Sequence, residues 1–262
     1  MSVPMGQRRT RESLLPPGGP LIRVTGLTMG WGDVVLQKDA TFDVARGEVF
    51  AILGGSGCGK STLLRYLIGL ETPLAGEIYI EGIGKPNLEV GRPPFGVMFQ
   101  SGALFGSLTV GENVGLSLEQ WTKLPREAIG AIVRAKLKLV GLDGAEDKFP
   151  SELSGGMKKR AAIARAMALE PDLLFLDEPS AGLDPVSAVE LDDLILTLNE
   201  VLGLTVVLVT HELASIFKIA KRCVMLDKET KSIIATGDPC VLRDESKDPR
   251  VHDFFNRVAK AS

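Results

Sequence analysis

The sequence predicts an α/β fold built on a mostly parallel sheet, and three observations lead to that prediction. A glycine-rich segment at 54–61 lies between an apolar stretch of strand character at 48–53 and a helical stretch at 62–68. Further along the chain, short apolar stretches alternate with helical ones, which is typical of strand–helix–strand units. An acidic pair, Asp177 and Glu178, directly follows one of these apolar stretches. In a parallel sheet such a pair lies at the edge where ligands bind.

The first part of the chain is predicted to form strands on both sides of the glycine-rich segment. Residues 21–44 form two strands around a turn at 30–33, where the sequence is Gly-Trp-Gly-Asp. The stretches 76–80 and 95–99 also have strand character. Between them, residues 82–94 are rich in Gly and Pro and are expected to form a loop.

The composition then turns helical, and residues 101–154 are expected to form an inserted helical subdomain. Pro125 starts one of its helices and Gly141 ends it. The apolar residues that share one face of this helix are Ile129, Ile132, Val133, Leu137 and Val140. The elements expected beyond the subdomain are a helix after Ser154, a strand at 173–176, a helix after Pro185 and a strand at 205–209. With the earlier strands they complete the alternation of strand and helix.

The segment 54–61, Gly-Gly-Ser-Gly-Cys-Gly-Lys-Ser, matches the phosphate-loop pattern at every fixed position. Glycines let backbone N–H groups turn toward a polyphosphate, and the following helix start adds partial positive charge. Lys60 is expected to reach the β- and γ-phosphates, and the Ser61 hydroxyl is expected to bind Mg²⁺. The residues predicted to bind the nucleotide here are Gly54, Gly55, Ser56, Gly57, Cys58, Gly59, Lys60, Ser61 and Thr62.

The acidic pair after the strand at 173–176 supplies the chemistry that a phosphate loop lacks. Asp177 is placed to hold Mg²⁺, directly or through water. Glu178 is placed to polarise an attacking water, a role that typically contributes about 10²–10⁴-fold to the rate. An acidic pair after a strand is weak evidence alone, but it becomes strong beside a phosphate loop.

Size and composition exclude several classes of protein. The chain has 262 residues, of which 45% are hydrophobic, so one large domain with a subdomain is expected. A net charge of -3 gives no indication of nucleic-acid binding. Three scattered cysteines fit a reducing compartment, and two histidines argue against a histidine-rich metal site. No apolar run reaches the roughly 18–20 residues of a membrane span. Residues 1–20 lack the apolar core of a signal peptide and are expected to be a disordered tail.

A second anion site is predicted at residues 153–157, Leu-Ser-Gly-Gly-Met, where a serine and two glycines open a helix. Together with the phosphate loop, this motif resembles the signature of the ATP-binding-cassette (ABC) family, which more often has Gln where this chain has Met157. The resemblance spans roughly residues 21–237. The further matches are Gln100 to the Q-loop glutamine, residues 180–184 to the D-loop, His211 to the switch histidine, and Trp31 to the aromatic position that stacks on adenine. The resemblance implies an ABC-type P-loop NTPase with a mixed sheet core, an antiparallel β subdomain and an inserted helical subdomain.

The resemblance also implies where ATP and Mg²⁺ bind and what each residue does. Two nucleotide-binding domains are expected to face each other head to tail and to close on ATP. The catalytic residues implied are Glu178, His211, Lys60 and Gln100, and the metal ligands are Ser61, Gln100 and Asp177. Ser154, Gly155 and Gly156 of the opposite chain would complete the site. Because one chain carries one phosphate loop and one signature, a homodimer or a pairing with another cassette chain is expected.

Several short stretches are similar to the ATPase of the Mla-type, MCE-associated lipid transporters. These stretches are residues 99–105, Met157, residues 168–173 and residues 248–255. The similarity implies an ATP-hydrolysing subunit that powers phospholipid or other lipid transport across the envelope of double-membrane bacteria. The implied partners are an integral-membrane permease, an MCE-type lipid-binding protein and, as a further option, a small cytoplasmic accessory subunit. The chain is therefore expected at the cytoplasmic face of the inner membrane, attached through the permease and not by its own sequence.

Two other functions stay open. The chain is compatible with an importer of a small solute such as an amino acid, because the permease and the binding protein select the cargo. It is also compatible with a soluble cassette ATPase of DNA repair or translation. Those proteins usually carry long coiled-coil insertions or two cassettes in one chain, and this sequence has neither.

Two apolar surfaces have alternative interpretations. After an ATPase domain at 21–245, residues 246–262 are predicted to form a C-terminal helical tail, in which Asp248 caps a helix begun by Pro249. The apolar residues on one face of this helix are Val251, Phe254, Phe255 and Val258. They pack either on this chain's own core or, as the resemblance favours, on the partner cassette. Leu104 and Phe105 lie either at the permease contact or in the core of the subdomain.

Overall fold

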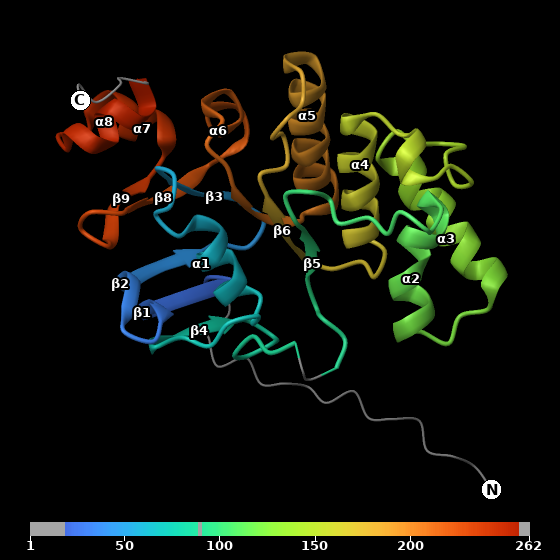
Figure 1. Ribbon diagram of the computed structural model, residues 1–262, viewed down its shortest axis with the longest axis horizontal. Helices are drawn as coiled ribbons and strands as arrows, with labels where there is room; N and C mark the ends of the chain where they lie inside the picture. The colour runs from blue at the N-terminus through green and yellow to red at the C-terminus, as the bar shows by residue number, and fades with distance from the viewer. Residues whose placement is uncertain (1–18, 89–90, 257–262) are drawn as a thin grey trace, which may run out of the picture.

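The computed structural model describes residues 19–88 and 91–256, and its strands form two sheets (Figure 1). The antiparallel sheet has the order β2–β1–β4, with β1 (Ile22–Trp31), β2 (Val34–Val44) and β4 (Ala75–Ile80). The larger sheet contains, in spatial order, β5 (Gly96–Met98), β6 (Leu173–Asp177), β7 (Thr205–Val209), β3 (Val49–Gly54), β8 (Arg222–Asp227) and β9 (Ser232–Gly237). Its neighbouring strands are parallel except for the β8–β9 pair. The predicted mixed sheet and separate antiparallel sheet are thus confirmed.

The central strands of the mixed sheet are buried on both faces, which explains their uninterrupted apolar sequences. Alternate residues of β3 enter two different hydrophobic cores. Phe50 and Ile52 belong to the core shared with the antiparallel sheet. Ala51 and Leu53 belong to a second core on the opposite face of the mixed sheet, called here the core under the larger helices. The mixed sheet is therefore the middle layer of the molecule.

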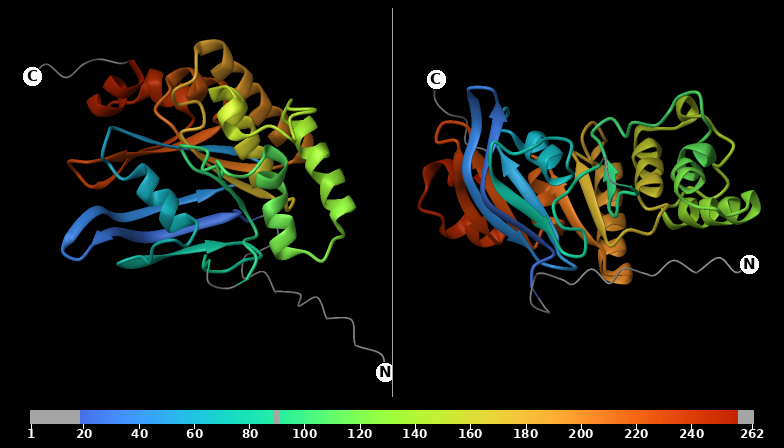
Figure 2. Two further views of the ribbon diagram at one scale, coloured as in Figure 1. Left: turned by 45° about the vertical axis from the view of Figure 1, so that its right-hand side comes forward. Right: turned by 90° about the horizontal axis from the view of Figure 1, so that it is seen from below.

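Helices cover both faces of the mixed sheet (Figures 1 and 2). The α-helices of the described chain are α1 (Lys60–Leu67), α2 (Val110–Trp121), α3 (Arg126–Leu139), α4 (Gly155–Ala166), α5 (Pro185–Leu202), α6 (Leu213–Ile219), α7 (Pro239–Glu245) and α8 (Pro249–Asn256). Helix α1 lies between the two sheets, while α4, α5 and α6 pack on the opposite face. Within residues 19–88 and 91–256, no helix is both long enough and apolar enough to cross a membrane.

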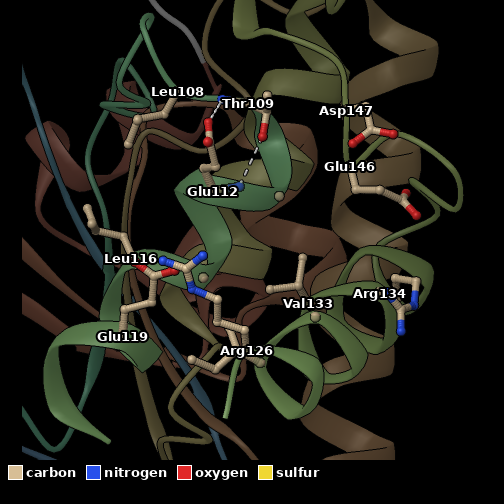
Figure 3. Close-up of a pocket in the computed structure, with 14 residues that line it drawn as sticks. Leu108, Thr109, Glu112, Leu116, Glu119, Arg126, Val133, Arg134, Glu146 and Asp147 are labelled. Carbon is tan, nitrogen blue, oxygen red and sulfur yellow. Dashed lines mark hydrogen bonds between the residues drawn. The ribbon is translucent and has the colours of Figure 1, made fainter. Parts of the chain in front are cut away.

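The helical subdomain projects from one end of the mixed sheet and contains α2 and α3 (Figure 1). Thr109 and Glu112 cap α2 reciprocally: Thr109 Oγ1 accepts the Glu112 N–H at 3.2 Å, and Glu112 Oε2 accepts the Thr109 N–H at 2.7 Å. The buried Asn113 side chain accepts the Phe105 N–H at 2.8 Å, which fixes the chain where it enters the subdomain. A cavity of about 550 Å³ between α2 and α3 is bordered by acidic and basic side chains (Figure 3), and it contains none of the predicted site residues.

The helix α8 packs on this chain's own core through two buried apolar residues, and the partly buried Phe254 packs against the same core. Val251 and Phe255 are buried in the core under the larger helices, and the Phe255 ring lies 5.6 Å from the Phe217 ring of α6. Asp248 caps the helix by accepting the Arg250 N–H at 2.9 Å. Packing within the chain therefore accounts for these two residues. Contact between the rest of the tail and a second copy stays a prediction, and Val258 and almost all of the predicted tail at 1–20 fall outside the described residues.

Candidate nucleotide-binding site

The phosphate loop joins the carboxyl end of β3 to the start of α1, at the centre of the mixed sheet. Gly54 has a φ of 141°, and a Cβ there would lie 2.4 Å from the Leu226 carbonyl oxygen and 2.6 Å from Cys58 Sγ. Only glycine, which has no Cβ, leaves room for these two atoms beside the backbone. The Cys58 side chain is buried, and its burial raises the pKa of the thiol. The sulfur therefore fills space beneath the loop, and the Cys58 side chain does not line the cavity described below.

A side chain of the antiparallel sheet supports the loop from behind. Gln37 of β2 is fully buried, and its Nε2 donates to the Cys58 carbonyl at 2.8 Å and to the Asp227 carbonyl at 2.9 Å. Asp227 ends β8, and its carboxylate accepts a hydrogen bond from Arg250 of α8 at 3.1 Å. The loop backbone is thus linked to β8 and, through it, to the C-terminal helix. Sequence reasoning missed Gln37, because a glutamine in a strand carries no local signal of burial.

A cavity of about 510 Å³ lies over the phosphate loop, and its lining comes from separate parts of the chain. The lining residues are Gly54, Gly55, Ser56, Gly57, Gly59, Lys60, Ser61, Thr62, Gln100, Glu178, His211 and Phe254. Lys60 Nζ donates to the carbonyls of Gly54 at 2.9 Å and Gly55 at 3.1 Å, which holds the ammonium over the loop. Phosphate oxygens are stronger acceptors for this ammonium than neutral carbonyls. The structure therefore brings the four predicted catalytic residues into one cavity.

Asp177 and Ser61 form a direct contact at the edge of this cavity. The Ser61 hydroxyl donates to Asp177 Oδ1 at 3.1 Å. Burial raises the pKa of Asp177, while the Ser61 hydrogen bond and the charge of Lys60 act in the opposite direction. Hydroxyl, carboxylate and amide oxygens are the hard donors that Mg²⁺ takes. Ser61 and Asp177 therefore present donors of the kind that fit Mg²⁺. In the described part of the chain no three His, Cys, Asp or Glu side chains form a cluster that could hold a metal ion.

Glu178, the residue after Asp177, lines the cavity in an unusual backbone conformation. Its φ is 48°, a left-handed backbone that costs a non-glycine residue about 1–2 kcal/mol. The Glu178 N–H donates to the Val209 carbonyl at 2.8 Å, and its Oε1 lies 2.8 Å from His211 Nδ1. Its Oε2 is buried and has no hydrogen-bond partner among the described residues. One carboxylate oxygen is thus fixed by the histidine, and the other accepts no hydrogen bond from the described residues.

Two cations of α4 hold the segment 100–105, called here the Q-loop segment. Lys159 donates to the carbonyls of Gln100 and Glu178, and Arg165 donates to the carbonyls of Gly102 and Ala103. Burial lowers the pKa of Lys159, and the nearby carboxylates oppose that shift. Neither residue was identified from the sequence, because neither lies in a recognised motif.

Five of the predicted nucleotide-binding residues do not line the cavity, namely Cys58, which is buried beneath the loop, and four residues outside the loop. Trp31 ends β1 and is 50% exposed. Ser154 caps α4 by accepting the Met157 N–H at 3.3 Å, and it is exposed together with Gly155. Gly156, the next residue of α4, also lies outside the cavity. The signature residues therefore lie outside the cavity over the phosphate loop of their own chain.

Comparisons with known proteins identify the family. Residues 37–181 match the model of the ABC transporter family. The chain is 42% identical over 246 residues to the probable ribonucleotide transport ATP-binding protein mkl of Mycobacterium leprae, covering 92% of this chain and 70% of that protein. It is 40% identical over 244 residues to the intermembrane phospholipid transport system ATP-binding protein MlaF of Escherichia coli strain K12, covering 91% of this chain and 90% of that protein.

Solved structures give the same result. The dimeric post-hydrolysis state of the ATP-binding cassette MJ0796, bound to ADP and Pi, has a TM-score of 0.73 and 29% identity, covering 83% of this chain and 98% of that chain. The structure of cbiO1 from Clostridium perfringens, part of the ABC transporter complex cbiONQ, has a TM-score of 0.76 and 31% identity, covering 89% and 94%. This chain belongs to the ABC transporter family, as an ATP-binding subunit that hydrolyses ATP.

Proposed function

We propose that this chain hydrolyses ATP at a site shared by two copies and thereby powers lipid transport across a bacterial envelope. The observation that carries the proposal is the cavity in which Lys60, Glu178 and His211 meet, in a chain 40% identical to MlaF. The match to MlaF covers nine-tenths of both chains.

The proposed chemistry assigns a task to each side chain of the cavity. The loop N–H groups and Lys60 bind the β- and γ-phosphates. Glu178 polarises the attacking water through its unpartnered Oε2, while His211 fixes the other oxygen of the same carboxylate. Ser61, Asp177 and Gln100 would hold Mg²⁺, which supplies positive charge against the phosphate oxygens. ATP binding closes the pair of chains, and hydrolysis reopens it.

The need for a second copy follows from the position of the signature. Ser154 is exposed at the start of α4 and lies outside the cavity of its own chain, so a second chain is needed to bring a signature to each phosphate loop. One structural neighbour is described as dimeric and bound to ADP and Pi, which supports this arrangement. A homodimer is the simplest assembly that completes both sites.

An apolar groove beside the Q-loop segment supports docking of a permease. The groove has a volume of about 510 Å³ and runs between β5 and α2. Phe99, Phe105 and Trp121 line it with 36%, 53% and 39% of their surfaces exposed. Leu104 instead packs partly buried against the core, so it is Phe105 that faces a partner. Because this groove adjoins Gln100, a permease segment seated in it would move the Q-loop segment.

The cargo is proposed to be lipid, although the names of the relatives differ. MlaF is named for intermembrane phospholipid transport, and mkl for probable ribonucleotide transport. The match to MlaF extends over 90% of that protein, against 70% of mkl. The proposal also includes two partners, an MCE-type lipid-binding protein and an accessory cytoplasmic subunit. It places this chain at the cytoplasmic face of the inner membrane. The name of mkl keeps a small-solute transporter as the second candidate.

The experiment that tests the cargo compares two kinds of defect in cells that lack the protein. Lipid transport predicts sensitivity to detergent, an altered distribution of phospholipid between membranes, and co-purification of an MCE-type protein from detergent-solubilised membranes. A normal phospholipid distribution together with failed uptake of ribonucleotides or another soluble nutrient would contradict the lipid proposal. Complementation with the Glu178→Gln variant is the matched control, because that variant is expected to bind ATP without turning it over.

A further inference from the structure

Lys159 is buried where three segments of the site meet, and the proposed chemistry gives it no task. It lies on α4, two residues after the signature at 153–157, and only 7% of its surface is exposed. Its ammonium donates to the Gln100 carbonyl, just past β5, and to the Glu178 carbonyl at 3.1 Å, just past β6. Burying an ammonium costs free energy unless its N–H groups are hydrogen-bonded. Breaking either of these two bonds would therefore be unfavourable.

We propose that Lys159 is a positioning residue that ties the backbone of the Q-loop segment to the backbone of Glu178. Through this tie, a displacement of Gln100 would be transmitted to the carboxylate that polarises water. The proposal rests on the catalytic role proposed above for Glu178.

The Glu178 end of this tie controls the direction of the carboxylate. The residue has a φ of 48°, so its peptide planes are held in place by their surroundings and not by local preference. Its N–H is bound to the Val209 carbonyl, and its own carbonyl is bound to Lys159. The following residue is Pro179, which has no N–H to add a further restraint. The Glu178 carbonyl also accepts the Ala181 N–H at 3.2 Å. Loss of the Lys159 bond would therefore leave this carbonyl held only by the following turn, while the N–H side of Glu178 stays anchored to Val209.

The Gln100 end lies beside the proposed permease groove. Arg165, six residues after Lys159 on the same helix, lines that groove and donates to the Gly102 and Ala103 carbonyls at 2.8 and 2.6 Å. Two cations of α4 thus donate hydrogen bonds to the Q-loop segment, and one of them, Lys159, also donates to the Glu178 carbonyl. A permease segment that shifts the Q-loop segment would therefore displace the Lys159 ammonium, which also binds the Glu178 carbonyl.

The test compares Lys159→Met with Lys158→Met in the purified full-length chain. Lys158 is adjacent in sequence but makes no such contact with Gln100 or Glu178. We expect Lys159→Met to lower the single-turnover hydrolysis rate, measured with the protein in saturating excess over ATP, by about 10- to 100-fold, as misplacement of a catalytic group does. The dissociation constant for ATP should stay within about twofold, because Lys159 does not line the cavity. Lys158→Met should leave both values unchanged, and Lys159→Arg should restore most of the rate.

Two further measurements separate positioning from general damage to the fold. In a double-mutant cycle with Glu178→Gln, Lys159→Met should add little to the loss of rate if it acts through Glu178. If Lys159→Met does not fold, Lys159→Arg is compared with Lys159→Gln, which keeps only a neutral donor and should be slower at equal ATP affinity. Equal rates for those two variants, or a Lys159→Met rate equal to that of Lys158→Met, would overturn the proposal. Normal hydrolysis by Glu178→Gln would instead refute the catalytic role on which it rests.

Discussion

Replacing Glu178 with Gln removes one ionisable oxygen and changes little else. The amide has the same size, and its oxygen can take the place of Oε1 beside His211 Nδ1, 2.8 Å away. What is lost is the negative charge on Oε2, which is buried and has no hydrogen-bond partner among the described residues. Loss of a general base slows a reaction by about 10²–10⁴-fold, equivalent to about 3–5 kcal/mol in the activation free energy. ATP binding should be preserved, because Lys60 and the loop are untouched.

The assay for Glu178→Gln pairs single-turnover hydrolysis with size-exclusion chromatography in ATP. The variant should accumulate as an ATP-bound dimer, because closure occurs and the hydrolysis that reopens the dimer does not. Glu212→Gln is the matched control, since Glu212 Oε1 lies 3.6 Å from the other ring nitrogen of His211 but outside the cavity. A Glu178→Gln rate within about threefold of the unmodified chain, or an equal loss in the control, would refute the assignment of the base.

Three other substitutions test the phosphate site, the groove and the tail. Lys60→Ala should raise the dissociation constant for ATP by about 10- to 100-fold, because a charge-assisted hydrogen bond to phosphate is lost; an unchanged value in a fluorescence titration would mean that the loop is not the phosphate site. Phe105→Glu should release the protein from membranes in cell fractionation without changing ATP affinity, and retention on membranes would contradict the proposed docking. Phe255→Ala should lower the free energy of unfolding in urea by about 3–5 kcal/mol, since this side chain is buried in the core. Val201→Ala, at a position 74% exposed, should change it by less than about 0.5 kcal/mol, and equal losses would refute the packing of α8.

The parts of the fold that the sequence predicts are those set by local patterns. The apolar stretch before the phosphate loop, the helix begun after Ser154 and the strand that ends at Asp177 each carry their own periodicity and end signals, and each is found where expected. The strand pair β8 and β9 was not predicted individually, because its second strand is only partly buried and has no clean alternation. Its antiparallel pairing depends on where the chain returns after α6, which no local pattern specifies.

In the candidate site, too, some residues could be predicted from the sequence and others could not. The phosphate-loop residues and the acidic pair at 177–178 could be named from motif and spacing, whereas Gln100 and His211 were named from the family resemblance. Lys159 and Gln37 lie in ordinary sequence and acquire their contacts only when α4 packs under the Q-loop segment and β2 packs behind the phosphate loop. Phe254 lines the cavity because α8 folds back onto the core, whereas the sequence indicated only an apolar helical face.

Mixing two inactive variants tests most directly whether ATP is hydrolysed between two copies of this chain. Ser154→Arg places a bulky cation where the opposite chain's nucleotide must approach, and Lys60→Ala disables the phosphate loop. A mixed dimer contains one site with both defects and one intact site. With random exchange of chains and independent sites, the mixture should recover about a quarter of the normal ATPase rate. Full activity of Ser154→Arg alone, or hydrolysis by that variant as a monomer, would contradict a shared site.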